Sequence, residues 1–133
     1  PKDIRKKLIA AKVFDDSRPM DGESDILGNV NLMFEDDETG VSVGLFYNLK
    51  GETYVSGDTA TDDIYVPNIV EKPVGTLDLV IGLKFAKIWR LGVEIKNLLD
   101  PDIETIYRTP YRDIPNTTYT IGRIYGLSLG CEW

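Results

Sequence analysis

Carboxylates are the side chains of this sequence with the greatest capacity for catalysis, and two of them are spaced to share one surface. Asp78 and Glu94 fall on two neighbouring predicted strands, at positions expected to face the same side. Carboxyl groups held about 5–9 Å apart can act as a general acid and a general base. Lys84, Arg90 and Lys96 fall on the same predicted surface. We therefore interpret the two acids as part of a charge-compensated surface rather than as a catalytic pair.

Other acids cluster in predicted turns and loops, where a bound cation has to be considered. The clusters are Asp15, Asp16, Asp21, Glu23 and Asp25, then Glu35 to Glu38, then Asp58, Asp62 and Asp63. None has the ligand spacing of an EF-hand loop. The sequence contains no His and a single cysteine, Cys131, which excludes His-dependent nucleophilic catalysis and the commonest zinc sites. We predict no metal, no cofactor and no enzymatic activity.

Tyrosines mark two long segments without clear periodicity. Tyr54 and Tyr65 lie in segment 50–75, and Tyr107 and Tyr111 lie in segment 100–119. Their neighbours are Thr, Asn and Asp, and together such side chains can stack on sugars or metal chelates and hydrogen-bond to them. The four tyrosines are candidates for substrate contact, although this is also an ordinary composition for exposed loops.

Length and charge limit the possible functions further. A chain of 133 residues fits one domain or one piece of a larger one. The sequence has 22 acidic and 15 basic residues, for a net charge of −7. This excess of acidic residues leaves no positively charged surface for the phosphate backbone of a nucleic acid. Nucleic-acid binding is therefore not expected.

Strict two-residue alternation predicts strands over much of the chain after residue 25. The segments are 27–34, 41–49, 76–85, 89–96 and 120–133. In each strand one parity is apolar and the other is mostly polar or small. The apolar parity includes Val30, Leu32, Val43, Leu45, Leu79, Ile81, Leu91, Val93, Leu127 and Leu129. Residues 1–25 have no clear pattern and are predicted as either a strand or a loop.

The connections between these strands alternate in length. Those at 35–40 and 86–87 are short, and those at 50–75 and 100–119 are long. Short turns at one end and long loops at the other are typical of outer-membrane barrels. We therefore predict an all-β fold, an antiparallel up-and-down meander of five or six strands within a large transmembrane β-barrel. Residues 1–25 form its N-terminal segment, and residues 26–133 form barrel strands with two long extracellular loops.

The positions of the aromatic residues agree with a barrel that has its short turns at one end. Phe34, Phe85, Trp89 and Trp133 have the apolar parity and lie at the short-turn ends of their strands, where a membrane barrel carries an aromatic girdle. A soluble antiparallel sheet with one face packed on a core would show the same alternation. The lengths of the strands exceed the usual five or six residues, and small residues with internal charges dominate the polar parity. Both features favour the barrel.

Four stretches resemble a known family in their order and spacing. Residues 119–133 resemble the closing strand of a TonB-dependent outer-membrane receptor, in which alternate apolar residues and a terminal aromatic are the signal for membrane assembly. The residues that carry this signal are Tyr125, Leu127, Leu129 and Trp133. The run Val93-Glu94-Ile95-Lys96-Asn97-Leu98-Leu99-Asp100 is similar to the penultimate strand of that family. Arg18-Pro19-Met20-Asp21-Gly22-Glu23-Ser24 and Glu38-Thr39-Gly40-Val41-Ser42-Val43 resemble a late barrel strand and the turn after it in Bacteroides-type receptors.

The resemblance implies a function in transport. Such receptors sit in the outer membrane of Gram-negative bacteria and take up a scarce nutrient, such as a metal chelate, a vitamin or an oligosaccharide. Expected partners are outer-membrane lipid, the rest of the same barrel with its plug, and the barrel-assembly machinery through the last strand. Contact with the TonB complex would use parts outside this sequence, so we expect the C-terminal portion of a receptor. The alternative is a soluble antiparallel β domain that binds a ligand or a partner.

Overall fold

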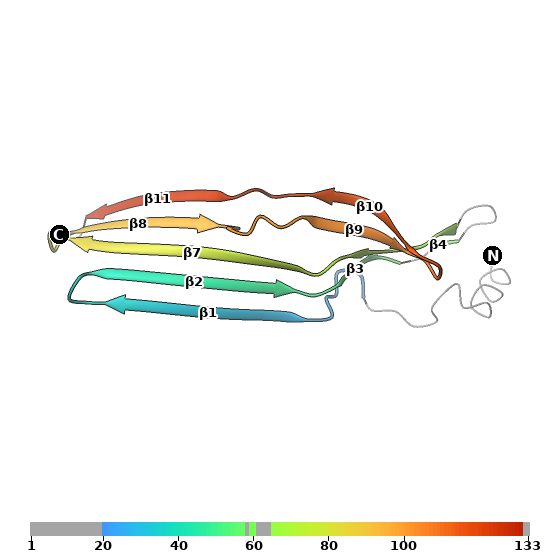
Figure 1. Cartoon of the computed structure of the whole chain (residues 1–133), viewed down its shortest axis with the longest axis horizontal. Helices are drawn as coiled ribbons and strands as arrows, with labels where there is room; N and C mark the ends of the chain where they lie inside the picture. Colours follow the sequence, from blue (N-terminus) through green and yellow to red (C-terminus); the bar gives the residue numbers. More distant parts are fainter. Residues whose placement is uncertain (1–19, 58, 61–64, 132–133) are drawn as a thin grey trace. The chain divides into compact units, whose positions relative to one another are not determined.

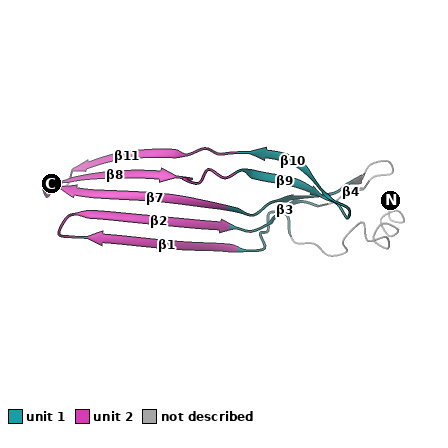
Figure 2. Cartoon of the chain, in the orientation of Figure 1, with its two compact units in different colours: residues 1–26, 50–74, 102–119 teal, residues 27–49, 75–101, 120–133 magenta. Residues whose placement is uncertain are grey.

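The computed structural model describes residues 20–57, 59–60 and 65–131, and every regular element in these ranges is a β-strand. The chain divides into two compact units, each assembled from three separate segments (Figure 2). Unit 1 contains residues 1–26, 50–74 and 102–119, and unit 2 contains residues 27–49, 75–101 and 120–133. The predicted all-β, antiparallel class is confirmed. None of the described residues belongs to a helix long and apolar enough to cross a membrane.

Unit 2 is built on a five-stranded antiparallel sheet. Its strands, in spatial order, are β1 (Leu27–Asp36), β2 (Val41–Lys50), β7 (Val74–Phe85), β8 (Trp89–Lys96) and β11 (Ile124–Cys131). Neighbouring strands run in opposite directions (Figure 1). Spatial order follows chain order, so these strands form a meander with β1 and β11 at its open edges. The structure shows an open sheet here and no closed barrel among the described residues.

The register between neighbouring strands keeps the apolar side chains on one face of the sheet and the polar or small side chains on the other. Ile81 is aligned with Val93 and Leu91 with Leu129, so apolar side chains lie side by side across the strands. The predicted strand 89–96 matches β8 in full. The last strand begins at Ile124 rather than at the predicted Thr120. The preceding Gly122 has a φ of 85°, a left-handed conformation that interrupts an extended strand.

The β7–β8 connection is a tight turn with an unfavourable sequence. Ala86 and Lys87 have φ values of 50° and 64°, which is the pattern of a type I′ hairpin turn. Asn and Gly are the usual residues at these positions, because other L-residues pay a steric penalty in the left-handed region. The hairpin therefore forms because its two strands pair well, despite the turn residues.

Replacing Ala86 by Asn should stabilise unit 2. We expect the free energy of unfolding to rise by about 0.5–1 kcal/mol, because Asn tolerates positive φ better than Ala does. Chemical denaturation followed by tryptophan fluorescence measures the change. Gly40→Ala is the control of opposite sign, since an added Cβ there would lie 2.6 Å from the carbonyl oxygen of Lys84. No gain for Ala86→Asn would contradict the turn assignment.

Unit 1 contains a four-stranded sheet that the periodicity did not predict. Its strands, in spatial order, are β10 (Asp113–Tyr119), β9 (Ile103–Arg108), β6 (Asn68–Glu71) and β3 (Thr53–Ser56), and β4 (Thr59–Ala60) pairs separately with β5 (Tyr65–Val66). Both segments predicted as long loops therefore carry strands. Register shifts between Tyr54 and Ser56 and between Pro115 and Thr117 break their alternation.

The small core of unit 1 lies on these short strands. Val70, Ile103 and Ile106 are buried. The described part of the N-terminal segment joins the same unit, because Ser24 bridges to Thr53. Hydrogen bonds from the Gly22 N–H to the Tyr54 carbonyl (2.6 Å) and from the Tyr54 N–H to the Glu23 carbonyl (3.0 Å) continue this pairing. The prediction for residues 1–19 lies outside the described residues.

Candidate functional site

One face of the unit 2 sheet exposes large apolar side chains along the whole length of its strands. Exposed members of the predicted apolar face are Val30, Leu32, Phe34, Ile81, Leu83, Phe85, Trp89, Leu127 and Leu129. The remaining predicted members, Val43, Leu45, Leu79, Leu91 and Val93, are half-buried by their neighbours in the sheet. Contiguous apolar surface of this extent is unusual on a monomeric soluble protein and marks a surface that is covered in use.

The opposite face of unit 2 combines small residues with charges. Gly82 is aligned with Gly92, and Gly92 with Ser128. A Cβ on Gly82 would meet the Ser42 hydroxyl, and one on Gly92 would come within 2.5 Å of the Ser128 hydroxyl. A side chain at either glycine would therefore require the neighbouring serine hydroxyl to rotate away. Phe46, the one large aromatic of this parity in β2, lies over Gly44, where a Cβ would be 2.8 Å from its ring.

The two acids considered for catalysis have separate structural partners. The Asp78 carboxylate accepts a hydrogen bond from the Asn97 N–H at 2.9 Å. Glu94 forms an ion pair with Lys96 at 3.1 Å. The register places Glu94 opposite Val80 rather than opposite Asp78. Glu94 is thus paired with one of the predicted cations, Asp78 is held by a backbone N–H, and the arrangement does not join the two carboxylates.

The Asn-Leu-Leu-Asp step after β8 forms a hydrogen-bonded junction with β7 and with the segment that precedes β11. Asn97 is buried, and its side-chain N–H donates to the Gly122 carbonyl at 2.9 Å. The Gly122 N–H donates to the Asp100 carboxylate at 3.1 Å, and the Arg123 Nε donates to the Leu98 carbonyl at 2.8 Å. Asn97 and Asp100 both have positive φ. The motif thus closes the ends of three strands, and its role is structural.

The four candidate tyrosines belong to unit 1, and Tyr54 and Tyr107 lie on different faces of its four-stranded sheet. Tyr54 is aligned with Val70, and Val70 with Ile106. Tyr107 follows Ile106 along β9, so its side chain points to the other face of the sheet. Tyr65 lies in β5. The structure therefore does not bring Tyr54 and Tyr107 onto one binding surface.

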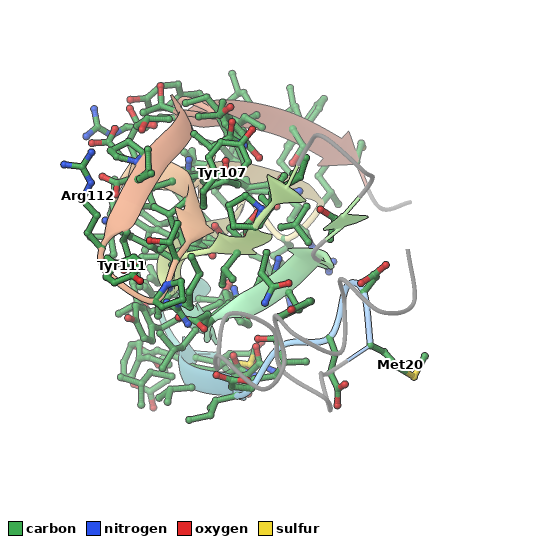
Figure 3. The ribbon with its side chains drawn as sticks, turned by 90° about the vertical axis from the view of Figure 1, so that its right-hand side faces the viewer. Met20, Tyr107, Tyr111 and Arg112 are labelled. Carbon is green, nitrogen blue, oxygen red and sulfur yellow. The ribbon has the colours of Figure 1, made fainter. Side chains whose placement is uncertain are left out.

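Tyr111 is the most exposed of the three candidate tyrosines whose side chains the structure describes. It lies in the turn between β9 and β10, and 92% of its surface is accessible. The Thr109 hydroxyl fixes this turn, because it donates to the Arg112 carbonyl at 2.6 Å and accepts from the Arg112 N–H at 3.2 Å. Figure 3 shows Tyr111 and Arg112 at one margin of the view and Met20 projecting at the other. An aromatic and a guanidinium side by side on a rigid turn suit contact with a ligand.

An ion cluster that was not predicted from the sequence joins β9 to β10 and to the segment before β3. The Arg108 guanidinium binds Glu52 through two nitrogens, one of them at 2.7 Å, and its Nε lies 3.8 Å from Asp113. The hydrogen bond to the Glu52 carboxylate raises the pKa of Arg108 above its already high usual value. Arg108 therefore remains charged at any physiological pH and holds these segments together.

The residues predicted to carry the membrane-assembly signal are accessible where the structure describes them. Tyr125, Leu127 and Leu129 are exposed on β11, and Trp133 lies outside the described residues. Cys131 is an exposed free thiol at the end of the same strand. Within the described ranges, no group of three or more acidic or cysteine side chains is placed to hold a metal ion.

Comparison with known proteins identifies no relative. No protein-family model matches the chain, and neither a curated protein nor a solved structure is significantly similar to it. The two faces of the unit 2 sheet are accordingly the basis on which a function can be inferred.

Proposed function

We propose that this chain is the C-terminal barrel segment of a TonB-dependent outer-membrane receptor that takes up a scarce nutrient. The observation that carries the proposal is the exposed apolar face of unit 2. Its side chains would face lipid, and the glycine, serine and charged side chains of the other face would line the interior. Alternation of this kind, apolar outward and polar inward, is the pattern of a transmembrane barrel wall.

The lengths of β1, β2 and β7 support the proposal, and β8 and β11 are slightly shorter than the expected span. β1 and β2 have 10 residues each, β7 has 12, and β8 and β11 have 8 each. A tilted strand needs about 9–11 residues to cross the hydrocarbon core. Exposed Phe34, Phe85 and Trp89 lie where these strands meet the short turns, at the level expected for an interfacial aromatic girdle.

The open edges support a segment rather than a complete pore. Unpaired edge strands such as β1 and β11 expose backbone donors and acceptors, which a membrane does not tolerate. The smallest bacterial barrels have about eight strands, and plugged transporters have about 22. The five strands of unit 2 would therefore be completed by other strands of the same receptor.

Detergent dependence tests the proposal. Residues 1–133 should aggregate in plain buffer and become monodisperse in a non-ionic detergent, as measured by size exclusion with light scattering. A sharp monomer or dimer in plain buffer would overturn the membrane assignment and favour a soluble β domain that buries its apolar face.

A second experiment tests the assignment to a receptor. When the chain is exported to the periplasm of a Gram-negative host, it should cross-link to the barrel-assembly machinery. Trp133→Ala should weaken this cross-link, whereas Trp89→Ala, a control on the other tryptophan, should not. Equal cross-linking of both variants would contradict the closing-strand assignment without affecting the detergent result.

A further inference from the structure

One arginine of unit 2 lies on the apolar side of the sheet. Arg123 comes directly before β11, and Ile124, the first residue of that strand, separates it from Tyr125. Side chains two positions apart along an extended chain point to the same side, so Arg123 shares the side of the exposed Tyr125. The cations within β7 and β8 have the polar parity instead.

Arg123 lies where the apolar ladder of β8 and β11 ends. On the apolar side, this ladder runs from the pair Trp89 and Cys131 to the pair Ile95 and Tyr125. The positions that follow are Asn97 on one segment and Arg123 on the other. A charge is costly at the midplane of a bilayer and costs little near its interface. With lipid on the apolar face, Arg123 would therefore lie at the level of the lipid head groups.

The Arg123 guanidinium is held in place but is not neutralised. Its Nε donates to the Leu98 carbonyl at 2.8 Å, which fixes the side chain against the end of β8. In the part of the chain that the structure describes, Arg123 forms no ion pair. Asp100, an acid of the adjacent junction, instead accepts a hydrogen bond from the Gly122 N–H at 3.1 Å. The two terminal nitrogens of Arg123 remain as donors, in the planar fork that matches the oxygens of a phosphate.

We propose that Arg123 binds the phosphate group of a membrane lipid at the long-loop end of unit 2. The choice of a lipid follows from the continuity of this position with the apolar face. Tyr125 and Leu127 would contact the acyl chains of the same lipid whose head group the guanidinium binds, and the nearby Leu99 and Ile121 are exposed as well. A free phosphate ion would gain nothing from these apolar side chains. The inference rests on the proposed function, because it requires lipid on the apolar face, and it names one residue that recognises the head group.

Titration of the ¹⁵N-labelled full chain in dodecyl maltoside with dodecyl phosphate tests the proposal. The Arg123 Nε–H and the amides of residues 121–125 should shift. Arg123→Gln should raise the mole fraction of dodecyl phosphate at half of the amide shift about two- to fivefold, the contribution of one exposed ion pair. Arg112→Gln, which removes an exposed arginine from the β9–β10 turn of unit 1, is the control and should leave this value unchanged. Inorganic phosphate at the same concentration should cause no comparable shift.

Arg123→Lys separates the fork from the charge and can keep the bond to the Leu98 carbonyl. This variant should bind dodecyl phosphate more weakly than the original chain and more tightly than Arg123→Gln, because an ammonium group lacks the planar fork. Unchanged affinity in Arg123→Gln would overturn the proposal. An equal loss in Arg112→Gln, or equal shifts with inorganic phosphate, would overturn it too, as general attraction to a charged micelle or binding of free phosphate. A chain that requires detergent but does not bind dodecyl phosphate loses only the role of Arg123, whereas a sharp monomer or dimer in plain buffer overturns the membrane assignment itself.

Discussion

Ile81→Arg should destabilise the membrane-bound chain by about 2–4 kcal/mol, because a charge at the bilayer midplane must leave water. Val80→Arg, one residue earlier, should cost no more than about 1 kcal/mol, because its side chain would face the polar side of the sheet. The two sites are closely matched. Both are β-branched aliphatic residues in the middle of β7, and each is 37% exposed.

This matched pair tests whether the apolar face is covered, and the detergent experiment tests whether lipid covers it. If nothing covered either face, these two equally exposed neighbours would tolerate Arg equally well, so a larger loss for Ile81→Arg shows that the apolar face is covered. The free energy of unfolding in phospholipid vesicles, from urea titration followed by tryptophan fluorescence, provides the comparison. Equal losses for Ile81→Arg and Val80→Arg would contradict the assignment of the apolar face to lipid.

The unit 2 strands could be predicted because their side chains alternate with few exceptions, such as Phe46 in β2. In β8, Trp89, Leu91, Val93 and Ile95 alternate with charged residues and glycine, and the predicted boundaries of this strand match the structure. A sheet with one apolar face imposes this period of two on each of its strands. The fold class therefore followed from the pattern alone.

The strands of unit 1 could not be predicted in this way. Two of its buried residues, Ile103 and Ile106, have opposite parity on β9, so they give no consistent alternation. The ladders that involve β3 and β10 contain register shifts, which move side chains from one face to the other. In these segments the backbone pairing depends on contacts between residues far apart in sequence, and a local pattern does not record them.

The sequence indicated which residues are candidates for the site, but it did not indicate which of them lie close together. Tyr54 and Tyr107 were assigned to two separate loops, and both belong to unit 1, where the sheet directs them to opposite faces. Lys84 and Arg90 were expected to share a surface, but the acidic turn between β1 and β2 also lies beside them. That neighbourhood results from the pairing of β2 with β7, two strands separated by the whole of segment 50–74.

Asn97→Ala should lower the free energy of unfolding of unit 2 by about 2–3 kcal/mol. The loss has two sources, a buried hydrogen bond worth about 1 kcal/mol and a left-handed backbone that costs most residues about 1–2 kcal/mol. Asn97 is only 8% exposed, its side chain donates to the Gly122 carbonyl at 2.9 Å, and its φ is 56°. Urea denaturation in dodecyl maltoside, followed by the fluorescence of Trp89, measures the loss.

Asn97→Gly separates the two contributions, because glycine adopts positive φ without strain. We expect this variant to lose only the hydrogen bond, about 1 kcal/mol, and to be more stable than Asn97→Ala by the backbone penalty. If the two variants were equally stable, the left-handed conformation would contribute nothing and the side-chain bond would account for the whole effect. The junction holds the ends of β7 and β8 next to the segment before β11, so the larger loss should also weaken the pairing of β11, the edge strand on which assembly with a partner strand would depend.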